Sequence, residues 1–103
     1  MLFGLLVTAA FAADPAAGKS LYAASCTACH GAAGDGKGPA AVALKPKPTD
    51  FTVAGWFTGK TDAQLVTAIR AGRPGTSMTP FTELSDAEAA DLVAYLRTFT
   101  KTP

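Results

Sequence analysis

The last third of the chain carries the strongest pattern of apolar and polar positions. Apolar residues recur there every three to four positions, which is the spacing of one helix face. This stripe consists of Ala89, Leu92, Val93, Leu96 and Phe99. Ser85 and Glu88 form an S-x-x-E capping box just before it, which marks a helix start. The pattern therefore predicts a helix that begins at Ser85 and runs through Phe99.

A second helix is predicted to begin at Thr61, because Gln64 completes a T-x-x-Q capping box with it. Gly72 follows the last apolar position and is the kind of residue that ends a helix. The apolar stripe between these two signals consists of Leu65, Val66 and Ile69.

A further helix is predicted nearer the N-terminus, from Asp14 to about Cys26. Asp14 suits the N-cap position and Pro15 suits the first helical position. Gly18 and Tyr22 lie four residues apart, so they share one face of this helix. Because glycine has no side chain, that face can approach another helix closely.

Residues 31–60 show no such period and contain two runs of loop-forming residues, GAAGDGKGP and KPKPTDF. No strand pattern and no internal repeat is found. The sequence therefore predicts an all-α domain in which three main helices are joined by long loops. Long loops in a small domain need something to hold them, and a bound cofactor would serve.

Composition and charge narrow the picture. The chain has 103 residues and is 49% hydrophobic, but many of these residues are alanines and large core-forming side chains are scarce. A domain of this size buries only about 60–65% of its unfolded surface, so a bulky apolar prosthetic group would complete its core. The net charge of +1 does not suggest nucleic acid or an anionic membrane as the main partner.

The first twelve residues, MLFGLLVTAAFA, carry no charge. They are too few to span a bilayer, which takes about 20 residues. They fit the apolar part of a secretory signal, with AFA at positions 10–12 as the cleavage site. No Lys or Arg stands near Met1, so an atypical signal, an upstream start or an uncleaved membrane anchor remain alternatives. We expect residues 1–12 to be cleaved, residues 13–103 to form the domain, and the protein to be periplasmic or otherwise exported.

Both cysteines and the only histidine lie within five positions, in SCTACHG. Cys26, Cys29 and His30 form the C-x-x-C-H pattern of c-type haem attachment, with two thioether sulfurs and an imidazole toward the iron. A thioredoxin-like redox pair would need a βαβ context. Structural zinc takes four Cys or His ligands, whereas the chain has three such residues. One covalently attached haem c is therefore the expected cofactor.

The iron also needs a sixth ligand or an open position, and few side chains are available to fill it. Met78 stands in PGTSMTPF, a stiff polar loop rather than a helix core. A lone methionine is more often core filler, but such a loop suits the delivery of one thioether. We therefore predict Met78 as the second axial ligand. Without it the haem would be five-coordinate, as in a sensor or a peroxidase-like protein.

Four segments together, GKSLYAASCTACHG, GKGP, PGTSMTPF and LSDAEAADLVAYLRT, resemble class I monohaem c-type cytochromes of the short bacterial kind. The resemblance covers most of residues 14–99. It implies a small cytochrome c fold, in which the first and last helices cross and the loops wrap around one covalently bound haem. The residues expected at this crossing are Gly18, Tyr22, Tyr95 and Leu96.

The resemblance also implies roles for two further residues. Pro39, after a G-x-G turn, would offer its carbonyl to the outer N–H of the haem histidine. Trp56 would line the haem edge and could donate its indole N–H to a propionate, with ordinary core packing as the alternative. Thr79 stands where the family often has proline directly after the methionine, which puts the rigidity of this loop in question. The expected pocket wall consists of Leu44, Phe51, Leu65, Val66, Ile69, Phe81 and Leu92.

These expectations converge on a one-electron carrier rather than an enzyme. His/Met ligation raises the reduction potential and leaves no open position for a small-molecule substrate. The partners would be redox proteins that donate and accept electrons, such as a membrane oxidase or reductase, with no nucleic acid, and the carrier would be a monomer. The alternative is a haem c subunit that acts as the internal relay of a larger oxidoreductase complex.

Charged residues are unevenly distributed along the sequence. Acidic residues concentrate in and just before the third helix, while basic residues gather in the loops that the resemblance places around the haem. These basic residues are Lys37, Lys45, Lys47, Arg70 and Arg73. They would form a weakly positive ring that steers an acidic partner, with a solvated surface of no docking role as the alternative.

Overall fold

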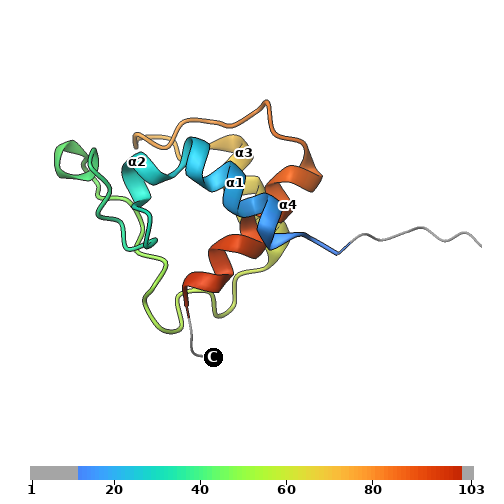
Figure 1. Cartoon of the computed structure of the whole chain (residues 1–103). Helices are drawn as coiled ribbons and strands as arrows, with labels where there is room; N and C mark the ends of the chain where they lie inside the picture. Colours follow the sequence, from blue (N-terminus) through green and yellow to red (C-terminus); the bar gives the residue numbers. More distant parts are fainter. Residues whose placement is uncertain (1–11, 101–103) are drawn as a thin grey trace, which may run out of the picture.

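The computed structural model describes residues 12–100, and within this range the chain consists of helices and loops without strands (Figure 1). The elements are α1 (Pro15–Ser25), α2 (Thr27–His30), the 3₁₀ helix η1 (Ala41–Ala43), α3 (Asp62–Ala71), α4 (Asp86–Leu96) and the 3₁₀ helix η2 (Arg97–Phe99). The predicted all-α class is confirmed. Of the expected signal segment, residues 1–11 lie outside the described residues.

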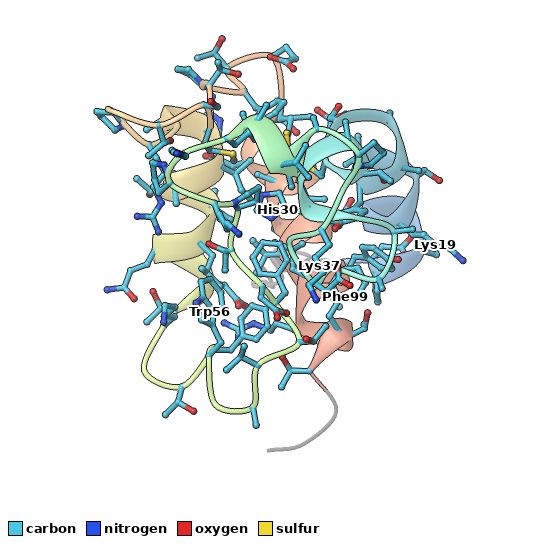
Figure 2. All side chains as sticks on the ribbon, turned by 90° about the vertical axis from the view of Figure 1, so that its left-hand side faces the viewer. Lys19, His30, Lys37, Trp56 and Phe99 are labelled. Atoms are coloured by element: carbon cyan, nitrogen blue, oxygen red, sulfur yellow. The ribbon has the colours of Figure 1, made fainter. Side chains whose placement is uncertain are left out.

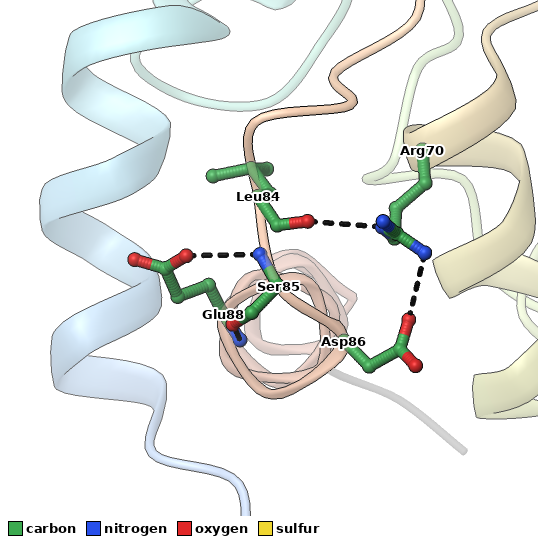
Figure 3. Close-up of polar contacts among 5 residues, drawn as sticks. All are labelled: Arg70, Leu84, Ser85, Asp86 and Glu88. Atoms are coloured by element: carbon green, nitrogen blue, oxygen red, sulfur yellow. Dashed lines mark hydrogen bonds and ion pairs between the residues drawn. The ribbon is translucent and has the colours of Figure 1, made fainter.

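The three predicted helix starts are confirmed by the side chains that cap them. Asp14 caps α1 with its carboxylate. At α3, Thr61 Oγ1 accepts a hydrogen bond from the Gln64 N–H at 3.1 Å, and Gln64 Oε1 accepts one from the Thr61 N–H at 2.9 Å. Ser85 and Glu88 form the same reciprocal pair at the start of α4, part of which is visible in Figure 3. Each box satisfies two backbone donors that a helix start leaves unpaired.

Helices α1 and α4 cross at close range (Figure 1). A side chain at Gly18 would collide with the Asp91 carbonyl oxygen and come within 2.9 Å of Tyr95 Cβ. One turn further along α1, the rings of Tyr22 and Tyr95 meet edge to face with their centroids 5.3 Å apart. The face shared by Gly18 and Tyr22 is therefore the face that contacts α4.

One helix ends where the sequence pattern predicts, and another ends earlier. The first ends at Ser25, and the chain then starts a new short helix, because Cys26 takes φ of −119° and its carbonyl accepts the His30 N–H at 2.9 Å. The last helix ends at Leu96 and tightens into η2. Such a 3₁₀ turn is common at helix ends.

One arginine joins the end of α3 to the start of α4 (Figure 3). Arg70 Nε donates to the Leu84 carbonyl at 2.9 Å, and Arg70 Nη1 donates to Asp86 Oδ1 at 3.0 Å. The ion pair is exposed, so it contributes about 1 kcal/mol at most. Its main effect is to fix the point at which the loop after α3 enters α4.

The core lies where α1, α3 and α4 meet, and the loop before α3 contributes one aromatic ring to it. Its members are Tyr22, Phe51, Leu65, Ile69, Leu84, Leu92, Val93 and Leu96. Within residues 12–100, no helix has the length and hydropathy needed to cross a membrane.

Candidate functional site

A cavity of about 490 Å³ lies between α2, α3 and the loops that flank them. Its volume falls within the roughly 300–1,000 Å³ range of small-molecule and cofactor pockets. Of the six residues that the sequence singles out, five line this cavity: Cys26, Cys29, His30, Trp56 and Met78. Pro39 is not part of its wall. Residues 52 positions apart in the sequence thus face one space.

The two cysteines reach the cavity from one turn of backbone. Cys26 precedes α2, Cys29 lies within it, and the Cys29 N–H donates to the Cys26 carbonyl at 3.3 Å. Both are half-buried free thiols. Burial, with a smaller contribution from Cys29, raises the pKa of the Cys26 thiol to about 11. Redox-active Cys-x-x-Cys pairs show the opposite shift, a lowered thiol pKa.

His30 is held by one backbone group and one aromatic ring. Its Nδ1 lies 3.1 Å from the Thr49 carbonyl oxygen, and its ring stacks on Phe51 with centroids 4.7 Å apart. A carbonyl can only accept, so this hydrogen bond requires the proton on Nδ1 and leaves the Nε2 lone pair free for a metal. Burial lowers the pKa of His30, which favours the neutral ring that a metal needs, although the bond to Thr49 opposes this shift.

The hydrogen bond that the family resemblance assigns to the Pro39 carbonyl is made by the Thr49 carbonyl in this structure. The Gly38 N–H donates to the Cys29 carbonyl at 3.0 Å, and the Ala40 N–H donates to the Ala28 carbonyl at 2.9 Å. These bonds tie both neighbours of Pro39 to α2 and leave Pro39 itself exposed. The partner of His30 in this structure is therefore the Thr49 carbonyl. Sequence reasoning missed Thr49, because a backbone carbonyl has no side-chain signal beyond the loop-forming KPKPT run.

A closed set of hydrogen bonds holds Met78. The Arg73 N–H donates to the Met78 carbonyl at 2.9 Å, and the Met78 N–H donates to Thr76 Oγ1 at 3.0 Å. Thr76 in turn donates to the Arg73 carbonyl through its N–H at 3.1 Å and its hydroxyl at 2.7 Å. The loop thus fixes its own backbone and leaves the half-buried methionine side chain facing the cavity.

Trp56 lines the cavity and also packs against the core. Its ring meets Phe51 and Phe57 edge to face, with centroids 5.4 and 4.8 Å away. Lys60 Nζ lies 4.3 Å from the ring centroid and donates to the Trp56 carbonyl at 2.6 Å. Figure 2 shows Trp56 below His30, on the same side of the molecule. These contacts fix the ring, while no partner is found for its indole N–H among the hydrogen bonds of residues 12–100.

The rest of the wall is mostly apolar, with two cations. Of the seven apolar residues expected there, five line the cavity: Leu44, Phe51, Leu65, Ile69 and Phe81. Val66 and Leu92 pack against or within the core instead. Lys47 and Arg73 also line the cavity, and no aspartate or glutamate does. The wall therefore suits a large apolar group that carries negative charge.

The donor set matches a haem of the c type. Two thiols on one turn can form two thioethers, a neutral imidazole and a thioether sulfur can bind iron, and the two cations can face carboxylates. The residues present therefore fit the group that the C-x-x-C-H pattern predicts.

Comparison with known proteins supports the same conclusion. The Cytochrome c family matches residues 15–100. The chain belongs to the cytochrome c family. It is 34% identical to cytochrome c6 of Picosynechococcus sp. over 90 residues, which cover 86% of this chain and 76% of that protein. It is also 39% identical to the dihydro-haem d1 dehydrogenase of Pseudomonas aeruginosa, over 93% of this chain but 18% of that protein.

Two solved structures share this fold. The KustC0563 c-type cytochrome superimposes with a TM-score of 0.67 at 31% identity, covering 82% of this chain and 98% of that chain. A chain of the Kuenenia stuttgartiensis reducing HAO-like protein complex Kustc0457/Kustc0458 gives a TM-score of 0.73 at 30% identity. This cytochrome covers 42% of that chain, so it corresponds to part of a larger protein there.

The fold and the family together establish what the protein does in general terms. It is a monohaem class I cytochrome that carries covalently bound haem c and transfers electrons.

Proposed function

We propose that Cys26 and Cys29 attach the haem through thioethers and that His30 and Met78 bind its iron. The observation that carries this proposal is the convergence of all four side chains on one cavity. A haem bound in this way supplies a one-electron Fe(II)/Fe(III) couple with a raised potential.

The other residues of the site hold these ligands in place. The Thr49 carbonyl fixes the imidazole of His30 and directs its Nε2 away from the backbone. The bonds between Arg73, Thr76 and Met78 fix the opposite loop. Because both ligands are held by the protein itself, little structural change is needed when an electron enters or leaves. If His30 and Met78 both bound the iron, no position would remain for a small-molecule substrate, so we propose a carrier and not an enzyme.

Lys47 and Arg73 can balance the negative charge of a group bound in the cavity. We assign them to the carboxylates of the haem, because they are the cations of the wall and no acidic side chain there competes for them. An ion pair of this kind keeps the carboxylate ionised, and the positive charge that remains nearby favours the reduced state of the iron.

The free carrier is the first candidate for the biological role. Its match to most of cytochrome c6 supports it. We expect a monomer in the periplasm or another exported compartment, after loss of residues 1–12, with redox proteins as donor and acceptor. The second candidate, an internal relay within a larger oxidoreductase, is favoured by the matches to parts of the dehydrogenase and of the HAO-like complex.

Three measurements test this proposal, the first two of them on the purified protein. Haem should stay with the chain on a denaturing gel, and colour lost on acid-acetone extraction would refute attachment. The visible and near-infrared spectra in both redox states should report His/Met ligation, and a five-coordinate ferrous spectrum would refute the assignment of Met78. Sedimentation of the protein from its native source then separates the free carrier, at the mass of one chain, from a complex subunit.

A further inference from the structure

The segment that carries Met78 turns back against the end of α3. The Arg73 N–H donates to the Met78 carbonyl at 2.9 Å, and the Phe81 N–H donates to the Ile69 carbonyl at 3.2 Å. We call residues 78–81 the ligand arm. Each end of this arm is thus joined by a backbone hydrogen bond to a residue in the last turn of α3 or just after it.

Gly72 stands, in the sequence, between the two residues that bond the arm. It is buried and ends α3, and its N–H donates to the Ala68 carbonyl at 3.0 Å. A Cβ at this position would lie 2.7 Å from both the Met78 carbonyl oxygen and the Pro80 nitrogen, and 2.8 Å from the Thr79 carbonyl carbon. Because a Cβ does not approach backbone atoms within 3.0 Å, the arm would have to move.

A glycine that only ends a helix does not need this close approach. Gly72 has φ of 72°, in the left-handed region that glycine adopts most readily. Gly75, in the same loop, has φ of 82°, and a Cβ there would have no heavy atom of residues 12–100 within 4 Å beyond its own chain neighbours. An alanine would strain the backbone at both positions, but of the two only Gly72 packs against the arm.

The contact bears on Met78 because the loop is anchored at the same place. Thr76 Oγ1 accepts the Met78 N–H and donates to the carbonyl of Arg73, the residue after Gly72. The Met78 backbone is therefore positioned from the end of α3 through both its N–H and its carbonyl. A shift of the arm away from Gly72 would displace the Met78 side chain from its position in the cavity wall.

We propose that Gly72 is a positioning residue for Met78: its lack of a side chain lets the ligand arm pack on the end of α3, which holds the thioether sulfur in place for the iron. This inference rests on the proposed ligation by Met78. A methyl group at position 72 would strain the arm while Met78 is bound, and release of Met78 would relieve that strain. Overpacking of this kind is large enough to change such an equilibrium about tenfold or more.

An added ligand measures this equilibrium. Imidazole binds the ferric haem when Met78 is released, so its apparent affinity rises in proportion to the released fraction. The imidazole nitrogen replaces the thioether sulfur on Fe(III), and no electron is transferred. The holoprotein is titrated with imidazole, and binding is followed in the visible spectrum. Gly72→Ala is compared with Gly75→Ala, which adds the same methyl group to the same loop without touching the arm.

Gly72→Ala should bind imidazole about tenfold more tightly than Gly75→Ala. The reason is that both variants strain the backbone, whereas only Gly72→Ala pushes on the ligand arm. Equal affinities of the two variants would overturn the proposal, since loop strain alone would then account for any change.

Amide hydrogen exchange in the unmodified protein gives a second test, which does not depend on a variant that folds. Saturation with imidazole should speed exchange at the Arg73 and Phe81 amides, because both hydrogen bonds between the arm and α3 should break when Met78 is released. If these two amides exchanged at the same rate with and without imidazole, Met78 would leave without the arm, and the role of Gly72 would be refuted.

Spectra of the same samples keep this inference apart from the proposed ligation. A spectrum without His/Met ligation in the unmodified protein would refute Met78 as the ligand, and this inference with it. A His/Met spectrum together with equal imidazole affinities of the two variants would refute the role of Gly72 alone.

Discussion

The crossing of α1 and α4 and the loop wall of the cavity are stabilised by different means. At the crossing, two helices approach so closely that Gly18 has no room for a side chain, and the rings of Tyr22 and Tyr95 fill the next turn. In the wall, the loops around Thr49 and Met78 are held by hydrogen bonds within the backbone and by hydrogen bonds between side chains and the backbone. The first region is a packed core, while the second lines the cavity.

This difference separates folding from function. The crossing is stabilised by the polypeptide alone, because all its contacts are between side chains and backbone of the chain. The wall surrounds a cavity of about 490 Å³ whose lining fits the haem, so its residues act on the bound group. We therefore expect substitutions at the crossing to change stability most, and substitutions in the wall to change the redox properties most.

The largest effect is expected for Gly18→Val. Its side chain would meet the Asp91 carbonyl and Tyr95 Cβ, so α1 and α4 would have to separate. Overpacking of this kind costs about 3 kcal/mol. Denaturant unfolding of the holoprotein measures the loss. Ala23→Val, on an exposed position of the same helix, should cost only about 0.5 kcal/mol, and equal losses would show that the crossing is not the critical contact.

Met78→Ala should have the next largest effect, and it should act on the haem rather than on the fold. Loss of a soft neutral ligand should lower the midpoint potential by on the order of 0.1 V or more, within the roughly 0.8 V that axial ligands span. Carbon monoxide should then bind the ferrous form readily. Thr79→Ala is the control, because Thr79 also lines the cavity; a similar drop there would implicate the loop and not the sulfur.

The contrast also explains what could be predicted from the sequence. Capping boxes and apolar stripes are local side-chain patterns, so the starts of α3 and α4 and the contact face of Gly18 and Tyr22 were predictable. The role of the segment from Cys26 to His30 was equally predictable, because haem attachment requires a fixed spacing of these residues. These features depend on a few residues close together in the chain.

The wall was less predictable, because backbone groups shape it. The carbonyl that meets His30 belongs to Thr49 and not to Pro39, and no side-chain pattern distinguishes one carbonyl from another. The apolar stripe on α3 likewise did not reveal which of its residues face the cavity. Leu65 and Ile69 face the cavity while Val66 does not, although all three lie within one apolar stripe.

A smaller effect, again confined to the wall, is expected for Arg73→Gln. Removing a positive charge from the wall of the haem cavity should lower the midpoint potential by on the order of 50 mV, equivalent to about 1 kcal/mol. Arg70→Gln is a matched control three residues earlier, because Arg70 binds Leu84 and Asp86 instead of facing the cavity. Arg70→Gln should lower stability slightly and leave the potential unchanged, and the reverse outcome would contradict the assignment of Arg73.

The smallest effects are expected from substitutions in the two capping boxes. The set of amides that each substitution loosens shows whether the crossing and the wall are separate units. Ser85→Ala and Thr61→Ala each remove one side-chain acceptor at a helix start, at a cost of about 0.5–1 kcal/mol. α4 is packed along α1, so loosening its first turn should raise amide hydrogen exchange in both helices. α3 borders the cavity on one side and contacts α4, but not α1, on the other, so Thr61→Ala should raise exchange mainly within α3 and leave the amides of α1 unchanged. If both variants loosened the same set of amides, the crossing and the wall would be one cooperative unit, and the separation of folding from redox tuning would not hold.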